Sequence, residues 1–387
     1  MEFANRMGLF KDGVFSHQQA LRNEFSAKMR IIDMGVGTPD LAPPAHVMKT
    51  LAEESLKPEN YAYAIRDLPE LRQAAADWYR RRYGVSLDPA SQIVSLLGSQ
   101  DGLVHIGLSM VNEGDTVLIP DPCYPAFADG QRIAGADIAF MPMREEKGFI
   151  IDLRDIPEET ARRARFMIIS YPNNPTSAMA PDEFYRDVIS FARQYDIAVL
   201  HDNAYSDIVF DGNCTGSFLR FEGAQDIGVE FNSLSKNYGM AGIRMGFCLG
   251  NADMVKNLTL LKSNMDYGAF IPIQRAAVAA LTGDQSCVSS SREAYRRRRD
   301  LLCDGLTSLG WKIPRSRATI FVWAHLPDGY TSSQDFCDDL IRRAGVIVTP
   351  GCAFGAMGEG FVRISLTRTE EEIRDAIDAI RDSGILA

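Results

Sequence analysis

Short apolar runs alternate with amphipathic segments through the first two thirds of the chain. Between the runs, segments such as 44–57 and 68–83 carry apolar residues at helical spacing. The runs that we interpret as buried strands are 93–97, 116–119, 166–170, 198–200, 229–231 and 247–249. Strands separated by helices predict an α/β fold, with a mostly parallel sheet covered by helices on both faces.

The pattern changes after residue 280 or so, where helices and strands no longer alternate regularly. We predict a long helix around 295–300 and further elements that indicate a smaller α+β domain: strands at 320–323, 346–351 and 361–365, and helices at 336–344 and 370–382. The first 30 residues have roughly helical spacing and predict an arm that packs on this small domain or on a partner. The predicted division is 1–45 for the arm and the start of the small domain, 46–280 for the large domain, and 281–387 for the rest of the small domain.

Polar and glycine-containing stretches follow most of the predicted strands. These stretches are 98–100, 121–125, 173–176, 202–205 and 233–236. In an open α/β sheet, ligands bind beyond the carboxyl ends of the strands. We therefore expect these stretches to meet at one edge of the sheet and to form a site there.

Composition narrows the classes of partner. The 387 residues include 41 Lys and Arg against 51 Asp and Glu, a net charge of −10, which argues against nucleic acid and anionic membranes as partners. The arginine run 296–299 is interpreted as a solvated helix face. No apolar run approaches the ~18 residues of a membrane span, and the N-terminus lacks a signal-peptide core. Seven scattered cysteines without a C-x-x-C predict reduced thiols, a cytoplasmic protein and no metal site.

The richest stretch chemically is 233–246, which reads S-L-S-K-N-Y-G-M-A-G-I-R-M-G. A partly desolvated lysine such as Lys236 is a good nucleophile. Ser233, Ser235 and Arg244 offer donors for a dianionic phosphate. A reactive lysine beside a phosphate seat suits pyridoxal 5'-phosphate (PLP), which carries an aldehyde and a phosphate. The alternative is a loop lysine on a solvated surface.

Other candidates follow the predicted strands. Asp202 would bind the pyridine nitrogen of PLP, with a helix cap as the alternative. Tyr205 and Asn174 would hydrogen-bond the phenolic oxygen of the ring, and Tyr124 would stack on it. Arg363 lies inside an apolar strand, where a buried guanidinium needs an anion, so a substrate carboxylate or a structural salt bridge is expected.

Two glycine-containing loops complete the candidate site. In 98–102 a strand meets a Gly/Ser turn and a helix start, which is a general anion seat. Gly37, in the loop 35–40, allows a ligand to approach the backbone closely.

Taken together, these residues give the chain a family resemblance over nearly its whole length. It resembles a fold-type I PLP enzyme of the class I/II aminotransferases. The resemblance implies that Lys236 binds the cofactor covalently and then moves the substrate proton. It implies that Arg363, with Gly37 and Asn174, binds the substrate α-carboxylate, and that the phosphate is held by Ser99, Gln100, Ser233, Ser235 and Arg244.

Within the family, several stretches are similar to the LL-diaminopimelate aminotransferase group, notably 143–149, 171–176, 229–231 and 262–264. Asp67 and Ser177 stand where the family usually has glycine. A family tyrosine reaches the phosphate of the neighbouring subunit, and Tyr63, or alternatively Tyr61, matches it. The resemblance thus implies a homodimer with shared active sites.

We therefore expect a cytoplasmic PLP-dependent aminotransferase that moves an amino group between an amino acid, LL-diaminopimelate or glutamate among the candidates, and a 2-oxo acid. Two alternatives remain open at this point: a PLP-dependent β-lyase on the same fold, and a non-catalytic binding module.

Overall fold

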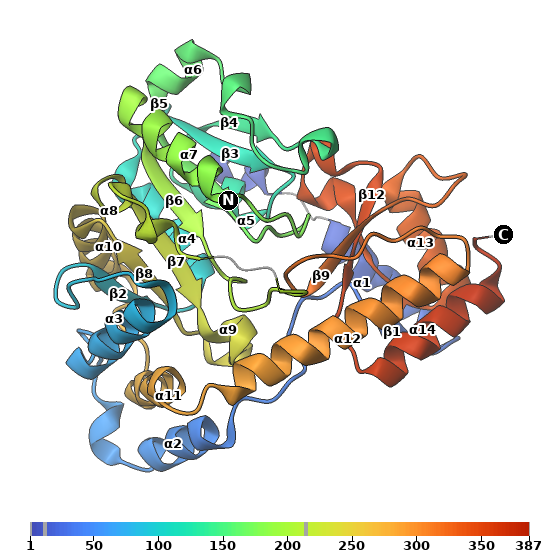
Figure 1. Cartoon of the computed structure of the whole chain (residues 1–387), viewed down its shortest axis with the longest axis horizontal. Coiled ribbons are helices and arrows are strands. Elements are labelled where there is room, and N and C mark those ends of the chain that lie inside the picture. The colour runs from blue at the N-terminus through green and yellow to red at the C-terminus, as the bar shows by residue number, and fades with distance from the viewer. Residues whose placement is uncertain (1, 11–13, 213–215, 387) are drawn as a thin grey trace.

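The computed structural model describes residues 2–10, 14–212 and 216–386. Its centre is a seven-stranded sheet with the order β2-β8-β7-β6-β5-β3-β4 (Figure 1). The strands are β2 (Ile93–Leu96), β3 (Thr116–Asp121), β4 (Asp137–Pro142), β5 (Ala164–Ser170), β6 (Ala198–Asp202), β7 (Gly228–Ser233) and β8 (Gly246–Gly250). β3, β5, β6 and β7 are buried along almost their whole length, as expected for strands covered on both faces.

Strand direction brings the predicted polar stretches to one edge. β8 runs antiparallel to both neighbours, β2 and β7, and the other adjacent pairs are parallel. β2, β3, β5, β6 and β7 consequently point the same way, and their carboxyl ends share one edge of the sheet. The prediction of a mostly parallel sheet is confirmed.

Helices cover both faces of this sheet. The first layer packs through the cluster that contains Leu103, Phe127 and Leu258, and comprises α4 (Ser99–Met110), α5 (Ala126–Ile133) and α10 (Ala252–Met265). The second layer packs through the cluster that contains Leu71 and Val188. Its helices are α2 (Ala45–Ser55), α3 (Pro69–Tyr83), α7 (Asp182–Tyr195) and α11 (Ile271–Thr282), with the shorter α6 (Glu158–Arg163), α8 (Ala224–Ile227) and α9 (Leu234–Asn237) nearby.

The C-terminal part builds a second core around an antiparallel sheet of order β11-β12-β9. Its elements are β9 (Phe321–His325), β11 (Thr349–Pro350), β12 (Phe361–Ser365), α12 (Ser286–Ser308), α13 (Ser333–Ala344) and α14 (Glu370–Ser383). Figure 1 shows α12 running from the helices beside the large sheet to this second core. We propose that the division between the domains lies near residue 280, where α11 ends and α12 begins.

The N-terminal segment lies on this second core. β1 (Ile32–Asp33) pairs in parallel with β10 (Val346–Ile347), and α1 (Val14–Phe25) packs on α13. The prediction of a single strand over 346–351 is wrong, because the chain changes partner at the buried Val348. β10 pairs with β1, whereas β11 pairs with β12.

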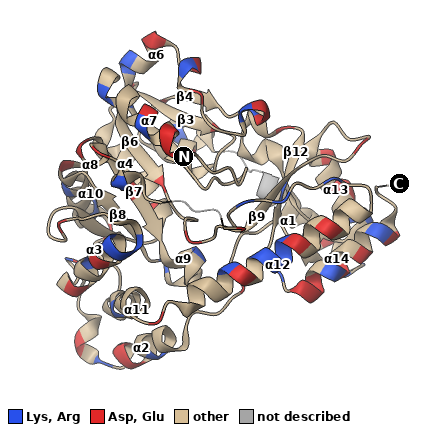
Figure 2. Cartoon of the chain, in the orientation of Figure 1, with Lys and Arg blue, Asp and Glu red and all other residues tan. Residues whose placement is uncertain are grey.

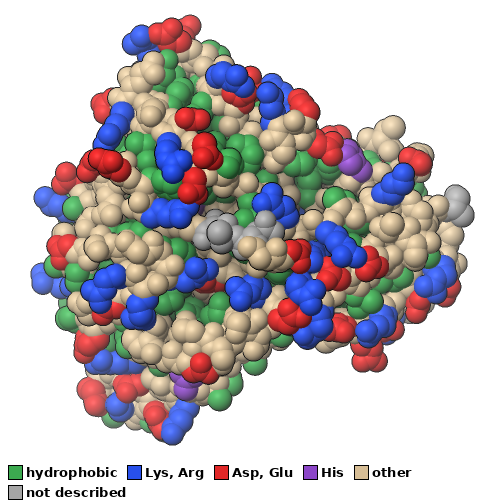
Figure 3. Space-filling view, in the orientation of Figure 1, with side chains coloured by type: hydrophobic (Ala, Val, Ile, Leu, Met, Phe, Trp, Pro, Cys, Tyr) green, Lys and Arg blue, Asp and Glu red, His purple; other side chains and the backbone are tan. Residues whose placement is uncertain are grey.

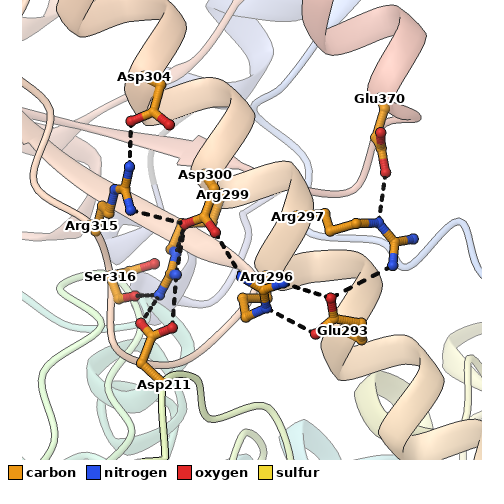
Figure 4. A network of polar contacts seen from close by, with 10 residues as sticks. All are labelled: Asp211, Glu293, Arg296, Arg297, Arg299, Asp300, Asp304, Arg315, Ser316 and Glu370. Atoms are coloured by element: carbon orange, nitrogen blue, oxygen red, sulfur yellow. Dashed lines mark hydrogen bonds and ion pairs between the residues drawn. The ribbon is translucent and has the colours of Figure 1, made fainter.

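The arginine run on α12 is a solvated face only in its first half, Arg296 and Arg297, and this corrects the prediction for the second half. Arg298 and Arg299 are buried: Arg298 forms a bidentate pair with Asp40, and Arg299 pairs with Asp211 and Asp300. Figure 4 shows the Arg299 contacts together with those of Arg296 and Arg297, which bond Glu293, Asp300 and Glu370. Arg298 and Arg299 are buried because α12 crosses between the two cores, where Asp40 and Asp211 pair with them.

Charged side chains of both signs are interspersed over the face seen in Figures 2 and 3. α12 and α14 each carry both signs along their length. In the described ranges, no helix is long and apolar enough to cross a membrane.

Candidate active site

The stretches at the carboxyl edge of the sheet enclose a cavity of about 420 Å³. All the predicted site residues except Tyr63 line it, and β9 and β12 close it from the second core. The predicted residues along its wall are Gly37, Ser99, Gln100, Tyr124, Asn174, Asp202, Tyr205, Ser233, Ser235, Lys236, Arg244 and Arg363.

Lys236 lies in the one-turn helix α9, directly after β7, and its amine points into the cavity. Nζ donates to the backbone oxygen of Gly37 at 2.7 Å. Burial, with the positive charges of Arg363 and Arg244, lowers the pKa of Lys236 to about 8, while Asp202 opposes the shift. Roughly a tenth of the amine is therefore neutral at pH 7, far more than for an ordinary lysine, and a nucleophile or base must be neutral.

Asp202 is the last residue of β6 and is buried. Burial raises the pKa of its carboxyl group to about 7, against the positive charges of His201 and Lys236. Among the described residues, its Oδ1 has no hydrogen-bond partner. A buried polar atom without a partner is costly, so the site needs a donor here, and no helix begins at Asp202 for it to cap.

The start of α4 lies on the cavity wall and offers donors to an anion. α4 begins there at Ser99, so its free N–H groups and positive dipole end face the cavity wall that also carries Ser233, Ser235 and Arg244. Gly98 adopts φ +86°, and a Cβ there would lie 2.3 Å from Arg244 Nη2. The glycine is thus needed for Arg244 to lie against the start of α4.

Arg363 on β12 is buried in the wall between the two cores. Its Nη1 donates to Asn174 Oδ1 at 2.9 Å and its Nη2 to the backbone oxygen of Gly35 at 2.8 Å. In the described part of the chain no carboxylate pairs with it, and its Nε has no partner. Burial disfavours the charged guanidinium and lowers the pKa of Arg363 to about 10. An anion bound here would stabilise the buried charge.

The sequence matches the model of the family "Aminotransferase class I and II" over residues 29–380. The chain belongs to this family. It is 47% identical to an LL-diaminopimelate aminotransferase from Moorella thermoacetica over 91% of this chain and 90% of the relative. A second LL-diaminopimelate aminotransferase, from Syntrophobacter fumaroxidans, is 44% identical over 98% of both chains.

A solved structure, the probable N-succinyldiaminopimelate aminotransferase from Thermus thermophilus, superposes with a TM-score of 0.90. It is 35% identical and covers 96% of this chain and 100% of its own. The protein is an aminotransferase with the fold-type I architecture, and the predicted fold class is confirmed. A non-catalytic module is therefore no longer an alternative.

Tyr124, Asn174 and Tyr205 complete the cavity wall of the aminotransferase. The hydroxyl group of Tyr124 donates to Gln100 Oε1 at 2.9 Å, so these two side chains form one wall. Asn174 accepts from Arg363 through Oδ1, which leaves its amide nitrogen to donate to a ligand. Burial raises the pKa of Tyr205 well above its usual value, so its hydroxyl group keeps its proton.

Phe321 at the start of β9 is a site residue that sequence reasoning missed. Its ring centroid lies 4.0 Å from the guanidinium carbon of Arg363, and a Cβ on Gly37 would come within 2.4 Å of the ring. Gly37 is therefore small because it packs on Phe321. No sequence signal marked Phe321, since an aromatic residue at the start of an apolar strand is ordinary core.

The two departures from the family pattern have structural partners. Ser177, at φ 59°, hydrogen-bonds Thr319 and the backbone oxygen of Phe321, and so ties the Asn174 loop to β9. Asp67 bonds the backbone and hydroxyl groups of Ser95 in β2. Both residues support elements around the site without lining the cavity.

Tyr61 and Tyr63 lie outside the cavity of their own chain. Tyr63 is 85% exposed and Tyr61 is 65% exposed. The hydroxyl group of Tyr61 donates to the backbone oxygen of Ser55 at 2.8 Å. Tyr63 makes a ring contact with Tyr267, but within the described ranges its hydroxyl group forms no hydrogen bond.

A larger hollow of about 540 Å³ is lined by Asp67, Lys262 and Tyr267 among others. Lys262 bonds both Asp101 and Asp266. These two aspartates and His105 come within 4.8 Å of one another, yet the Lys262 ammonium group already occupies the place of a cation. The 420 Å³ cavity, which contains the unpartnered carboxylate of Asp202, is therefore the candidate active site.

The lowered pKa of Lys236 can be tested by chemical labelling. In protein freed of bound ligand, the rate at which trinitrobenzenesulfonate labels Lys236 should titrate with a midpoint near pH 8, below the ~10.4 of ordinary lysines. Peptide mass spectrometry over a pH series measures this. Arg363→Gln removes a positive charge and should raise the midpoint, whereas Arg275→Gln, at a surface pair with Glu70, should not. A midpoint equal to that of the surface lysines would contradict the assignment.

Proposed function

We propose that this aminotransferase uses PLP in the cavity described above. The observation that carries the proposal is the pairing, in one cavity, of a lysine with a lowered pKa and a buried carboxylate that lacks a partner. A pyridine ring with a phosphate and an aldehyde fits this set. Asp202 would meet the ring nitrogen, Lys236 the aldehyde, and the seat of Ser99, Ser233, Ser235 and Arg244 the phosphate.

The residues of the chain would divide the work as follows. PLP, when bound, supplies an aldehyde for Lys236 and a ring that withdraws electrons from the reacting carbon. Asp202 holds the proton at the ring nitrogen, and Asn174 and Tyr205 donate to the phenolic oxygen. Lys236, as a neutral amine near pH 8, takes a proton from the substrate carbon and returns it.

Arg363 would orient the substrate by its α-carboxylate. Its free Nε and its burial make the guanidinium a strong anion site, and Asn174 and Gly35 fix its plane. Phe321 covers one side and keeps water from the charge. A carboxylate bound here lies in the cavity that also holds the Lys236 amine.

The proposed amino donor is LL-diaminopimelate, with 2-oxoglutarate as the acceptor. The support is the identity of 47% and 44% to relatives named for that substrate. The cationic residues that line the cavity, within the described ranges, are Lys236, Arg244 and Arg363. All three already have roles, so the second carboxylate of either substrate would be met by polar groups or by a partner subunit.

We further propose a homodimer with shared active sites, in the cytoplasm. Exposed aromatic and aliphatic side chains cluster around the loop that holds Tyr61, and such a cluster marks an interface. They are Tyr61, Tyr63, Ile65, Met265, Tyr267 and Phe270. The described cysteines are free thiols, which fits a reducing compartment; Cys214 lies outside the described residues.

Replacing the lysine tests the central claim. Lys236→Ala should lower turnover by at least about a thousandfold, because the group that moves the proton is lost. It should also abolish the visible absorbance that depends on the covalent bond to PLP. Lys49→Ala, at an exposed pair with Glu53, is the matched control and should keep both. A Lys236→Ala enzyme with undiminished turnover would refute the assignment.

A substrate panel tests the donor and the reaction class together. We expect LL-diaminopimelate to convert the PLP-bound enzyme faster than glutamate, aspartate or alanine at equal concentration, as measured by single-turnover absorbance changes in the absence of any 2-oxo acid. A β-lyase would instead release pyruvate and ammonia from a cysteine-type substrate without any 2-oxo acid. That release, or a clear preference for another donor, would overturn the corresponding part of the proposal.

The shared site predicts different effects for the two loop tyrosines. Tyr63→Phe should weaken PLP binding by about tenfold, the loss of one hydrogen bond to a charged group. Tyr61→Phe, whose hydroxyl group already serves Ser55, should change it by less than about twofold. Cofactor titration of both variants, with sedimentation of the wild type, measures this. A monomer, or equal effects of the two variants, would contradict the shared site.

A further inference from the structure

Directly behind Asp202 the sheet holds a buried ion pair that the function does not yet use. β6 and β7 are parallel, and His201 lies opposite Glu230 in the register. Both side chains are fully buried on the face that α7 covers, where the His201 ring meets Tyr185 and Phe218. Side chains alternate along a strand, so Asp202, the next residue, points to the opposite face and into the cavity.

The carboxylate of Glu230 is surrounded by donors. The groups that donate to it, at 2.8–2.9 Å, are Tyr79 Oη, His201 Nδ1, Asn203 Nδ2, Ser217 Oγ and the backbone N–H of Phe218. Burial alone would raise the pKa of Glu230, but the hydrogen bond and charge of His201, with Asn203 and Tyr79, lower it overall. Glu230 is therefore an ionised carboxylate inside the protein.

The contacts of His201 determine its protonation. Nδ1 faces Glu230 Oε2 at 2.9 Å, and Nε2 faces the backbone oxygen of Tyr171 at 3.1 Å. An ionised carboxylate and a carbonyl group both accept and cannot donate. A ring that carries protons on both nitrogens would donate to both acceptors, and Glu230 would hold its positive charge.

We propose that His201 and Glu230 are positioning residues that hold a fixed positive charge behind Asp202 and keep its carboxyl group ionised opposite the ring nitrogen of the cofactor. This inference rests on the proposed use of PLP. It assigns a role to a pair that touches neither cofactor nor substrate, and it gives a physical reason why a buried aspartate can stay charged in this aminotransferase.

The charges around Asp202 support the direction of the effect. Burial favours the neutral acid and raises the pKa of Asp202. The positive charges of His201 and Lys236 lower this pKa, whereas the negative charge of Glu230 raises it. The charge of Lys236 is lost when its amine reacts, whereas the charge of His201 is held by a hydrogen-bonded partner and stays. Without His201, a proton shared between Asp202 and the ring nitrogen should shift toward Asp202.

The test uses the PLP-bound enzyme and the 15N chemical shift of isotopically labelled PLP. In His201→Asn, an amide nitrogen can still donate to Glu230 but carries no charge. We expect the ring-nitrogen signal to move toward that of the neutral ring, and single-turnover proton abstraction to slow by about tenfold, the equivalent of one pKa unit.

The matched control is Tyr79→Phe, which removes one donor from Glu230 at 2.8 Å and changes no charge. It should lower the thermal stability without moving the ring-nitrogen signal. If His201→Asn and Tyr79→Phe leave the signal equally unchanged, the pair is only a structural contact and the proposal is overturned.

If the variants do not fold, the protonation of the His201 ring in the wild type provides the test. In 15N-histidine-labelled enzyme, His201 should show protons on both ring nitrogens at neutral pH; a neutral ring would overturn the proposal. Failure of the proposed cofactor can also be told apart from failure of the positioning role. If the wild type binds no PLP, the proposed cofactor is wrong. If it binds PLP and transaminates while His201→Asn gives the wild-type nitrogen signal, only the positioning role fails.

Discussion

A buried carboxylate with an unpaired oxygen, that of Asp202, is the constraint on which the site depends. A charge or an open acceptor in the interior is costly unless something meets it. In this chain Lys236 lies in the same cavity, and His201 lies on the opposite face of β6. The unpaired oxygen of Asp202 faces the cavity, so a hydrogen-bond donor that binds there stabilises the folded protein.

The parallel sheet makes this arrangement possible. Because β2, β3, β5, β6 and β7 end at one edge, residues far apart in the chain reach a common cavity without long loops. Side-chain alternation then separates two environments across a single strand. On β6, one face carries the cavity carboxylate and the other carries a buried ion pair, so the electrostatics of the site are set from both sides of the sheet.

Much of the fold and of the candidate site could be predicted from the sequence. The polar stretches after the strands, Lys236 with its serines, and an arginine inside an apolar strand are signals with a chemical reason, and the cavity contains them. Phe321 could not be found, because its role comes from packing against Gly37 across the two cores. The burial of Arg298 and Arg299 was missed for a similar reason: their partners Asp40 and Asp211 are distant in sequence. The role of Tyr63 does not follow from the packing of its own chain, because its side chain is exposed.

Arg363 has a consequence for selectivity. The folded protein already holds this guanidinium away from water, braced by Asn174 and by the backbone of Gly35, before any substrate arrives. An amine without a carboxylate would enter the cavity and leave that cation unmet, whereas an amino acid neutralises it. With Arg363 in the proposed role, simple amines would bind less well than amino acids without any steric clash, because only a molecule with a carboxylate pairs with the buried cation.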